Sequence, residues 1–71
     1  MYKNMELNER LRELRREKGL TLKQVSCALQ LTLNAYANYE YGIREPSVDV
    51  IKRLCGFYNV SADYLLGIKD D

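Results

Sequence analysis

Residues 21–40 constrain this chain more than any other stretch, and they read TLKQVSCALQLTLNAYANYE. Apolar side chains recur through residues 22–29 at the three- and four-residue spacing of one buried helix face. A threonine precedes this segment and another precedes residues 33–41, where a side-chain oxygen can cap free backbone N–H groups. Gln30 and Leu31 are left to connect the two segments. The stretch therefore predicts two short helices joined by a tight corner.

Two helices joined by three or four residues form a helix-turn-helix. In this arrangement the second helix protrudes from the body and is able to enter a DNA major groove. The same pattern also occurs in helical bundles that bind nothing, so this stretch alone leaves both interpretations open.

Composition narrows the class of protein. A chain of 71 residues suits one domain with a single apolar core, here residues 1–71. There is no apolar run of membrane-spanning length and no signal-peptide pattern, so we expect a cytoplasmic protein. Histidine is absent and Cys27 and Cys55 lie far apart, which removes zinc-site spacing and the usual general base. We therefore expect no metal, no cofactor and no enzymatic activity.

Charge is distributed unevenly, although the net charge is only +1. Residues 1–31 hold seven basic and four acidic side chains, whereas residues 32–71 hold four basic and six acidic ones. The run NERLRELRREK is expected to be mostly a solvated helix face. We expect modest non-specific attraction to DNA, with groove contacts and dimerisation supplying much of the remaining affinity.

The predicted fold is an all-α bundle of five helices, at about residues 6–18, 22–29, 33–41, 48–58 and 62–66. Left-handed glycines are expected to end three of them, at Gly19, Gly42 and Gly67. The fourth helix is expected to bury Val48, Ile51, Leu54, Cys55 and Tyr58. On the third, Tyr36 and Tyr39 are expected to face inward, and Leu33, Asn34, Ala37 and Asn38 outward. Residues 1–5 and 68–71 are expected to be flexible.

Three runs of sequence resemble one family: LRELRREKGLT, YEYGIREPS and FYNVSADYLLG. Through them, residues 7–67 resemble the lambda-repressor-like (Cro/cI, xenobiotic-response-element) helix-turn-helix DNA-binding domain. The VSADYLLG ending is similar to small phage and mobile-element repressors of Gram-positive bacteria. The resemblance implies a bacterial transcriptional repressor, associated with the nucleoid when bound, that binds double-stranded DNA as a homodimer on an inverted repeat.

The resemblance also implies a role for individual residues. Arg15 and Glu40 match a partly buried salt bridge between the first and third helices. The positions that face bases or nearby phosphates are Leu33, Asn34 and Asn38. The positions that meet the DNA backbone are Thr21, Lys23, Thr32, Tyr41, Ile43 and Arg44. For the dimer contact, the apolar residues of the last helix and its end are the candidates: Tyr64, Leu65 and Ile68.

One departure from the family concerns the third helix, which carries Leu33 where relatives place glutamine, arginine or lysine. Asn34 or Asn38 can contact adenine, and Leu33 can contact a thymine methyl group, so we expect a half-site rich in A·T pairs. The apolar Leu33 also keeps a second interpretation open, a protein-interaction module of the same fold such as an antitoxin or anti-repressor.

Two further alternatives concern side-chain chemistry. The tyrosines at helical spacing can be read as a stacking platform for single-stranded nucleic acid, but core packing is favoured; they are Tyr36, Tyr39, Tyr58 and Tyr64. Cys27 is expected on the exposed side of the second helix, near the DNA-facing edge. An inert thiol is favoured there over a redox switch.

Overall fold

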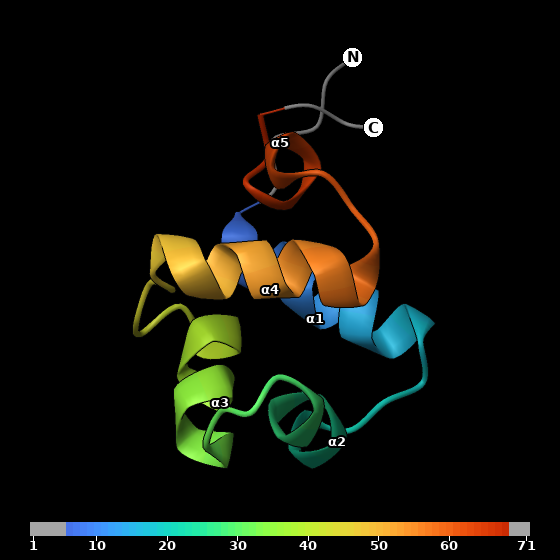
Figure 1. Cartoon of the computed structure of the whole chain (residues 1–71), viewed down its shortest axis with the longest axis vertical. Coiled ribbons are helices and arrows are strands. Elements are labelled where there is room, and N and C mark those ends of the chain that lie inside the picture. The colour runs from blue at the N-terminus through green and yellow to red at the C-terminus, as the bar shows by residue number, and fades with distance from the viewer. Residues whose placement is uncertain (1–5, 69–71) are drawn as a thin grey trace.

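The computed structural model describes residues 6–68, and the regular secondary structure in that range is helical. The helices are α1 (Leu7–Glu17), α2 (Leu22–Ala28), α3 (Leu33–Tyr41), α4 (Val48–Tyr58) and α5 (Ala62–Leu65) (Figure 1). The predicted all-α fold is confirmed, with every helix boundary within one residue of its predicted place. None of the described helices is long and apolar enough to cross a membrane. The ends predicted to be flexible lie outside the described residues, apart from Ile68.

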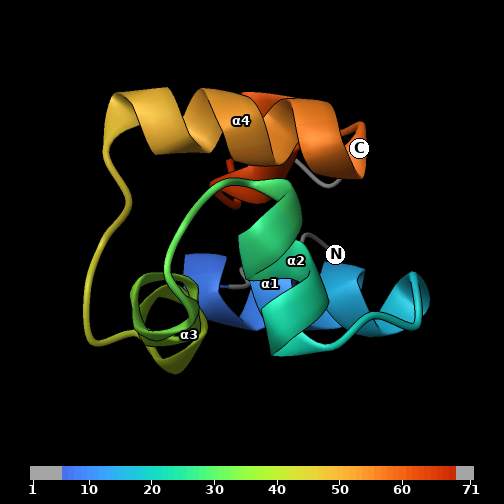
Figure 2. The same cartoon turned by 60° about the horizontal axis from the view of Figure 1, so that its bottom comes forward.

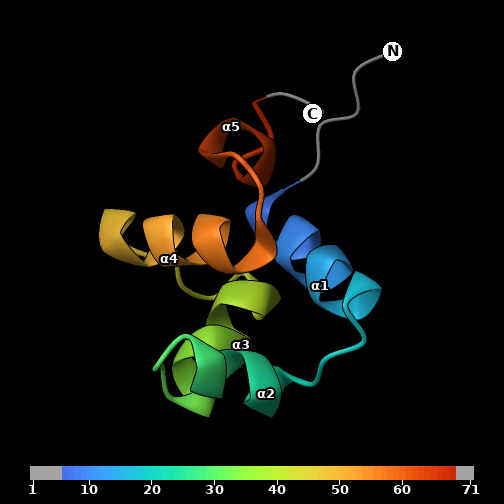
Figure 3. The same ribbon diagram turned by 45° about the vertical axis from the view of Figure 1, so that its right-hand side comes forward.

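The helix-turn-helix occupies one end of the molecule. In Figure 1, α2 and α3 lie together at one end of the longest axis and α5 lies at the other, with α1 and α4 between them. Figures 2 and 3 show α2 beside α3 from two further directions. α3 packs against both α2 and α1, whereas α5 packs against α4 and α1. The second helix of the motif is therefore held from one side by the body of the domain.

Local side-chain chemistry sets where the helices begin and end. The Gln24 backbone N–H donates to Thr21 Oγ1 at 3.1 Å, and the Thr21 N–H donates to Gln24 Oε1 at 2.9 Å. This reciprocal capping box starts α2. Thr32 caps α3 by accepting from the Ala35 N–H at 3.1 Å. Gly42 ends α3 with φ of 76°, a left-handed conformation that glycine adopts without steric cost.

The corner between α2 and α3 is closed by backbone hydrogen bonds. The Gln30 N–H donates to the Cys27 carbonyl at 3.1 Å, and the Leu31 N–H donates to the Ser26 carbonyl at 2.9 Å. Gln30 has φ of 58°, so a non-glycine residue adopts the left-handed conformation that turns the chain. The corner between the two helices is as short as predicted.

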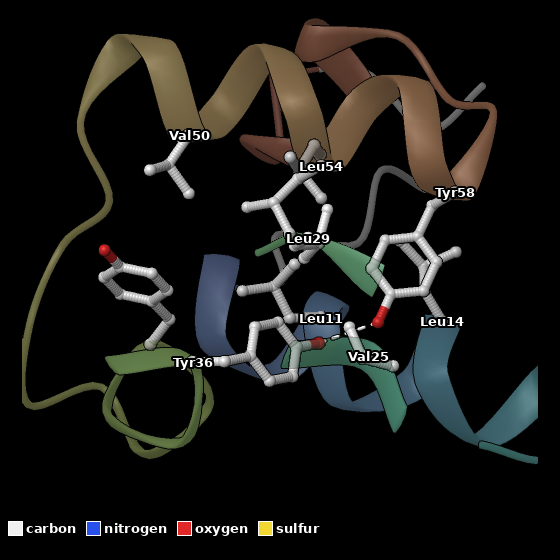
Figure 4. Close-up of a cluster of buried hydrophobic side chains, with 10 residues drawn as sticks. Leu11, Leu14, Val25, Leu29, Tyr36, Val50, Leu54 and Tyr58 are labelled. Carbon is white, nitrogen blue, oxygen red and sulfur yellow. Dashed lines mark hydrogen bonds between the residues drawn. The ribbon is translucent and has the colours of Figure 1, made fainter. Parts of the chain in front are cut away.

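Side chains from all five helices form the core (Figure 4). Its fully buried members include Leu11 of α1, Val25 of α2 and Tyr36 of α3. The Tyr36 and Tyr58 hydroxyls lie 2.7 Å apart inside the core and share a hydrogen bond between α3 and α4. Burial, and then the hydrogen bond to Tyr58, raise the pKa of Tyr36. The tyrosines therefore serve as core residues, as predicted, with both buried hydroxyls protonated at neutral pH.

Two side chains, Val48 and Ala37, lie on the opposite side of their helices from the one predicted. Val48 is 71% exposed, and Val50 is buried in its place. Val50 is four residues before Leu54 and eight before Tyr58, so these three form the inward stripe, and Val48 points elsewhere because two residues rotate a helix by about 200°. Ala37 is buried as well, because it lies beside Tyr36 on the side of α3 that meets the core.

Substitution of the paired tyrosines tests whether the buried hydrogen bond couples α3 to α4. We expect Tyr36→Phe and Tyr58→Phe each to lower the free energy of unfolding by about 1–2 kcal/mol, since each leaves one buried hydroxyl without this partner. The double variant should lose about 1 kcal/mol less than the sum of the two single losses. Urea unfolding followed by circular dichroism measures all four proteins. Tyr41→Phe is the matched control, because Tyr41 is 59% exposed. Strictly additive losses would contradict the coupling.

Candidate nucleic-acid interface

One buried ion pair holds α3 against α1. Arg15 Nε donates to Glu40 Oε2 at 2.7 Å, and Arg15 Nη2 donates to Glu40 Oε1 at 3.1 Å. The Glu40 side chain is 1% exposed and that of Arg15 is 16% exposed. The hydrogen bond to Glu40 raises the pKa of Arg15. The structure thus contains the ion pair that the resemblance implies, in the bidentate geometry in which arginine binds carboxylates most strongly.

The same guanidinium also holds the segment that leads into α2. Arg15 Nη1 donates to the Leu20 carbonyl at 2.9 Å, one residue before the capping box of α2. Sequence reasoning missed a second contact of this kind, in which Arg12 Nη1 donates to the Glu40 carbonyl at 3.2 Å. Arg12 precedes Arg15 by three residues, so the two share a face of α1, and that spacing was the available signal. The position of α3 therefore depends on two arginines of α1.

The exposed surface of α3 carries no charge. Glu40 is the only charged residue within Leu33–Tyr41, and it is buried. Leu33, the first residue of α3, is 47% exposed, and Asn34 is exposed. Asn38 follows Asn34 by four residues and is half-buried. We call Leu33, Asn34 and Asn38 the α3 face. Within residues 6–68 neither asparagine side chain has a hydrogen bond, so both amides are available to a ligand.

The residues predicted to meet the DNA backbone are all exposed and come from three places. Lys23 lies on α2, while Ile43 and Arg44 follow α3. The Ile43 and Arg44 N–H groups donate to the Asn38 carbonyl at 3.0 and 3.3 Å, which fixes the start of this loop at the end of α3. The remaining members are Thr21, Thr32 and Tyr41. Figure 2 shows α2 beside α3, and the loop after α3 running from α3 to α4 on the side away from α2.

The residues predicted to form the dimer contact do not share one environment. Leu65 is completely buried in the core, so its assignment to an interface was wrong. α5 is a single turn whose Leu65 points into the bundle and therefore leaves its neighbour Leu66 41% exposed. Ile68 is 61% exposed, and Tyr64 is half-buried. Among the described residues of α5 and the segment after it, the exposed large apolar side chains are Leu66 and Ile68.

Arg10 was also placed incorrectly on a solvated face. It is 6% exposed, and its guanidinium lies 4.1 Å from the centroid of the Tyr64 ring, in a cation–π contact between α1 and α5. Its Nε atom is buried without a hydrogen-bond partner among the described residues. Arg10 is three residues after Leu7 and four before Leu14, a spacing that places it on the inward side of α1. Cys27 is exposed, as predicted.

Two capped helices, a tight corner and a protruding second helix define a helix-turn-helix domain. A family model described as helix-turn-helix matches residues 11–65. The chain is 43% identical over 67 residues to the HTH-type transcriptional regulator ImmR of Bacillus subtilis, covering 94% of this chain and 52% of ImmR. It is 36% identical over 63 residues to YobD of the same organism, an uncharacterized HTH-type transcriptional regulator, covering 89% of this chain and 56% of YobD.

A solved structure agrees with these similarities. The crystal structure of a transcriptional regulator from Listeria innocua matches 87% of this chain and 58% of its own, with a TM-score of 0.82 and 29% sequence identity. The chain belongs to the lambda-repressor-like helix-turn-helix family. It spans about half the length of the curated relatives that it matches.

Removal of the Arg15 side chain tests how much the ion pair holds α3 in place. We expect Arg15→Ala to lower the free energy of unfolding by about 3–5 kcal/mol, because it leaves the buried Glu40 carboxylate without its cation. Arg15→Lys should restore only part of this loss, since an ammonium group lacks the bidentate fork. Arg16→Ala, which removes an exposed arginine of the same helix, is the control and should change the value by less than about 0.5 kcal/mol. An Arg15→Ala loss as small as that of the control would contradict the assigned role.

Proposed function

We propose that this chain is a sequence-specific DNA-binding transcriptional regulator that places α3 in a major groove. The observation that carries the proposal is the α3 face, which is uncharged and holds two unpaired amides, with Leu33 and Asn34 exposed and Asn38 half-buried. Amide side chains donate and accept hydrogen bonds at once, and this matches the paired donor and acceptor of adenine in the major groove. Membership of the helix-turn-helix family and the similarity to transcriptional regulators support the same function.

In the proposed complex, attraction to DNA and reading of its sequence use different residues. Lys23 and Arg44 supply positive charge to phosphates from α2 and from the loop after α3. The other proposed backbone contacts are Thr21, Thr32, Tyr41 and Ile43. Thr21 and Thr32 hydroxyls accept cap hydrogen bonds within the chain, and each can still donate its own proton to a phosphate oxygen. Base contacts come from the α3 face.

We further propose that the chain binds an inverted repeat as a homodimer, with the two copies of α3 about one helical turn of DNA apart. Tyr64 and Ile68, together with Leu66, are the proposed contact. α5, which holds Tyr64 and directly precedes the other two, lies at the opposite end of the molecule from α3, so pairing through them would leave the α3 face free (Figure 1). Bound in the cytoplasm at a promoter of phage or mobile-element origin, such a dimer would repress transcription by occupancy and would need no cofactor.

A protein-interaction module of the same fold, an antitoxin or anti-repressor, is the second candidate. The observation in its favour is Leu33, an apolar side chain that is 47% exposed at the start of α3. The two functions differ in their dependence on salt, because phosphate binding releases counterions and weakens as salt concentration rises.

Selection of duplexes from a random pool, followed by binding of the selected duplex over a series of salt concentrations, tests the function. We expect inverted half-sites and an affinity that falls with salt. Arg44→Ala should weaken binding to all duplexes alike and reduce the slope of log affinity against log salt by about 1 for each phosphate that is no longer neutralised. Asn38→Ala should cost about 1–3 kcal/mol on the selected duplex and relax preference at one base pair.

Lys52→Ala is the matched control for Arg44→Ala, because Lys52 is an exposed cation of α4 outside the proposed interface. It should leave both the affinity and the salt slope unchanged. Specific binding that Asn38→Ala leaves intact would show that the base-reading face is wrong. Failure to bind any duplex, or binding without salt dependence, would favour the protein-interaction module.

A further inference from the structure

We infer that Leu33 reads the C5 methyl group of a pyrimidine, so that the chain distinguishes methylated from unmethylated pyrimidines at one position in each half-site. This inference rests on the proposed function and goes beyond it by naming the atom that is read. The same contact would make binding responsive to the methylation of a cytosine at that position.

The place of Leu33 in the fold puts it where bases are read. It is the first residue of α3, directly after the capping residue Thr32. The N-terminal residues of a helix inserted into the major groove are those that contact base edges. Thr32 has its hydroxyl engaged by the Ala35 N–H, and Asn34 is the next exposed side chain. Leu33 is thus the exposed apolar residue of the leading turn, because Ala35 is half-buried and Tyr36 is buried.

Leu33 does not pack in the core. It belongs neither to the buried cluster nor to the half-buried side chains packed against that cluster, and 47% of it is exposed. Leu29 and Leu31, which precede it around the corner, are buried and half-buried and do pack there. The exposed apolar surface of Leu33 is therefore not explained by the packing of the described residues.

The chemistry of the major groove leaves one good partner for such a side chain. Every base pair presents hydrogen-bond donors and acceptors on this edge, and thymine alone among the four bases adds an apolar group, its C5 methyl. Leucine forms no hydrogen bond, so covering a polar base atom with it would remove water without replacing the hydrogen bond that the water made. Contact with a methyl group avoids that cost and buries apolar surface on both sides.

Bases that carry a methyl group at C5 are equivalent at this contact. Cytosine methylated at C5 presents a methyl group at the position where thymine does, whereas uracil and cytosine present hydrogen there. α3 exposes no charged side chain, so no charged contact from this helix competes with the contact between Leu33 and the methyl group. Leu33 should therefore add to the binding affinity only where the base carries a C5 methyl group.

Removal or addition of single methyl groups in the selected duplex tests the inference. Each thymine of the half-site is replaced in turn by deoxyuridine, and affinity is measured by fluorescence anisotropy. We expect one position at which the unmethylated base weakens binding by about fourfold, the effect of one buried methyl-sized group. At that position 5-methylcytosine should bind about fourfold more tightly than cytosine. Leu33→Ala should abolish both differences at that position while keeping the dependence on Asn38.

Val48→Ala is the matched control, because Val48 is a 71% exposed apolar residue outside the α3 face. It should retain the full response to deoxyuridine. The inference is overturned if no thymine of the half-site gives more than a twofold effect, or if Leu33→Ala keeps the whole effect. Both of those results presuppose specific binding, so they leave the proposed function standing. A chain that binds no selected duplex overturns the function and the inference together.

Discussion

The contact between Arg15 and Glu40 is the interaction on which the rest of the candidate interface depends. A carboxylate that is 1% exposed is tolerated only with a cation and well-aligned hydrogen bonds, and the arginine fork supplies both. Because the same guanidinium binds the Leu20 carbonyl, it fixes α1, the approach to α2 and the end of α3 relative to one another. A buried ion pair of this kind sets orientation more clearly than it raises stability. Here the orientation it sets is that of α3.

Turning Glu40 inward has a chemical consequence for the outer surface of α3. With its one acidic residue neutralised in the interior, the helix presents an apolar side chain and two amides and repels no phosphate. It also attracts none, so in the proposed complex Lys23 and Arg44 provide the attraction from neighbouring segments. Affinity and specificity then reside on different elements, a division common in protein–DNA recognition, in which backbone contacts position and base contacts specify.

Helix boundaries were predictable from sequence because they depend on local chemistry, such as the Thr21 cap and Gly42. Helix rotation was less predictable, since tertiary packing decides which of two neighbouring apolar residues turns inward. Val48 and Leu65 were misassigned for that reason. Val50 is buried in place of Val48, and Leu66 is exposed in place of Leu65. The pairing of Arg15 with Glu40 followed from family resemblance, as 25 residues separate them. The roles of the α3 face stay predictions, because base contacts depend on docked geometry that neither sequence nor fold specifies.

The central claim, that α3 is presented to the DNA groove by its anchorage to α1, is tested most directly by the side-chain amide signals of Asn34 and Asn38. A nitrogen-15 NMR titration of the chain with its selected duplex follows them residue by residue. Both signals should move on binding, while the backbone amide of Lys52 on the exposed side of α4 stays in place. In Arg15→Ala, under conditions where it remains folded, the shifts should shrink together with the affinity. Specific binding that leaves both asparagine signals unmoved would contradict the account.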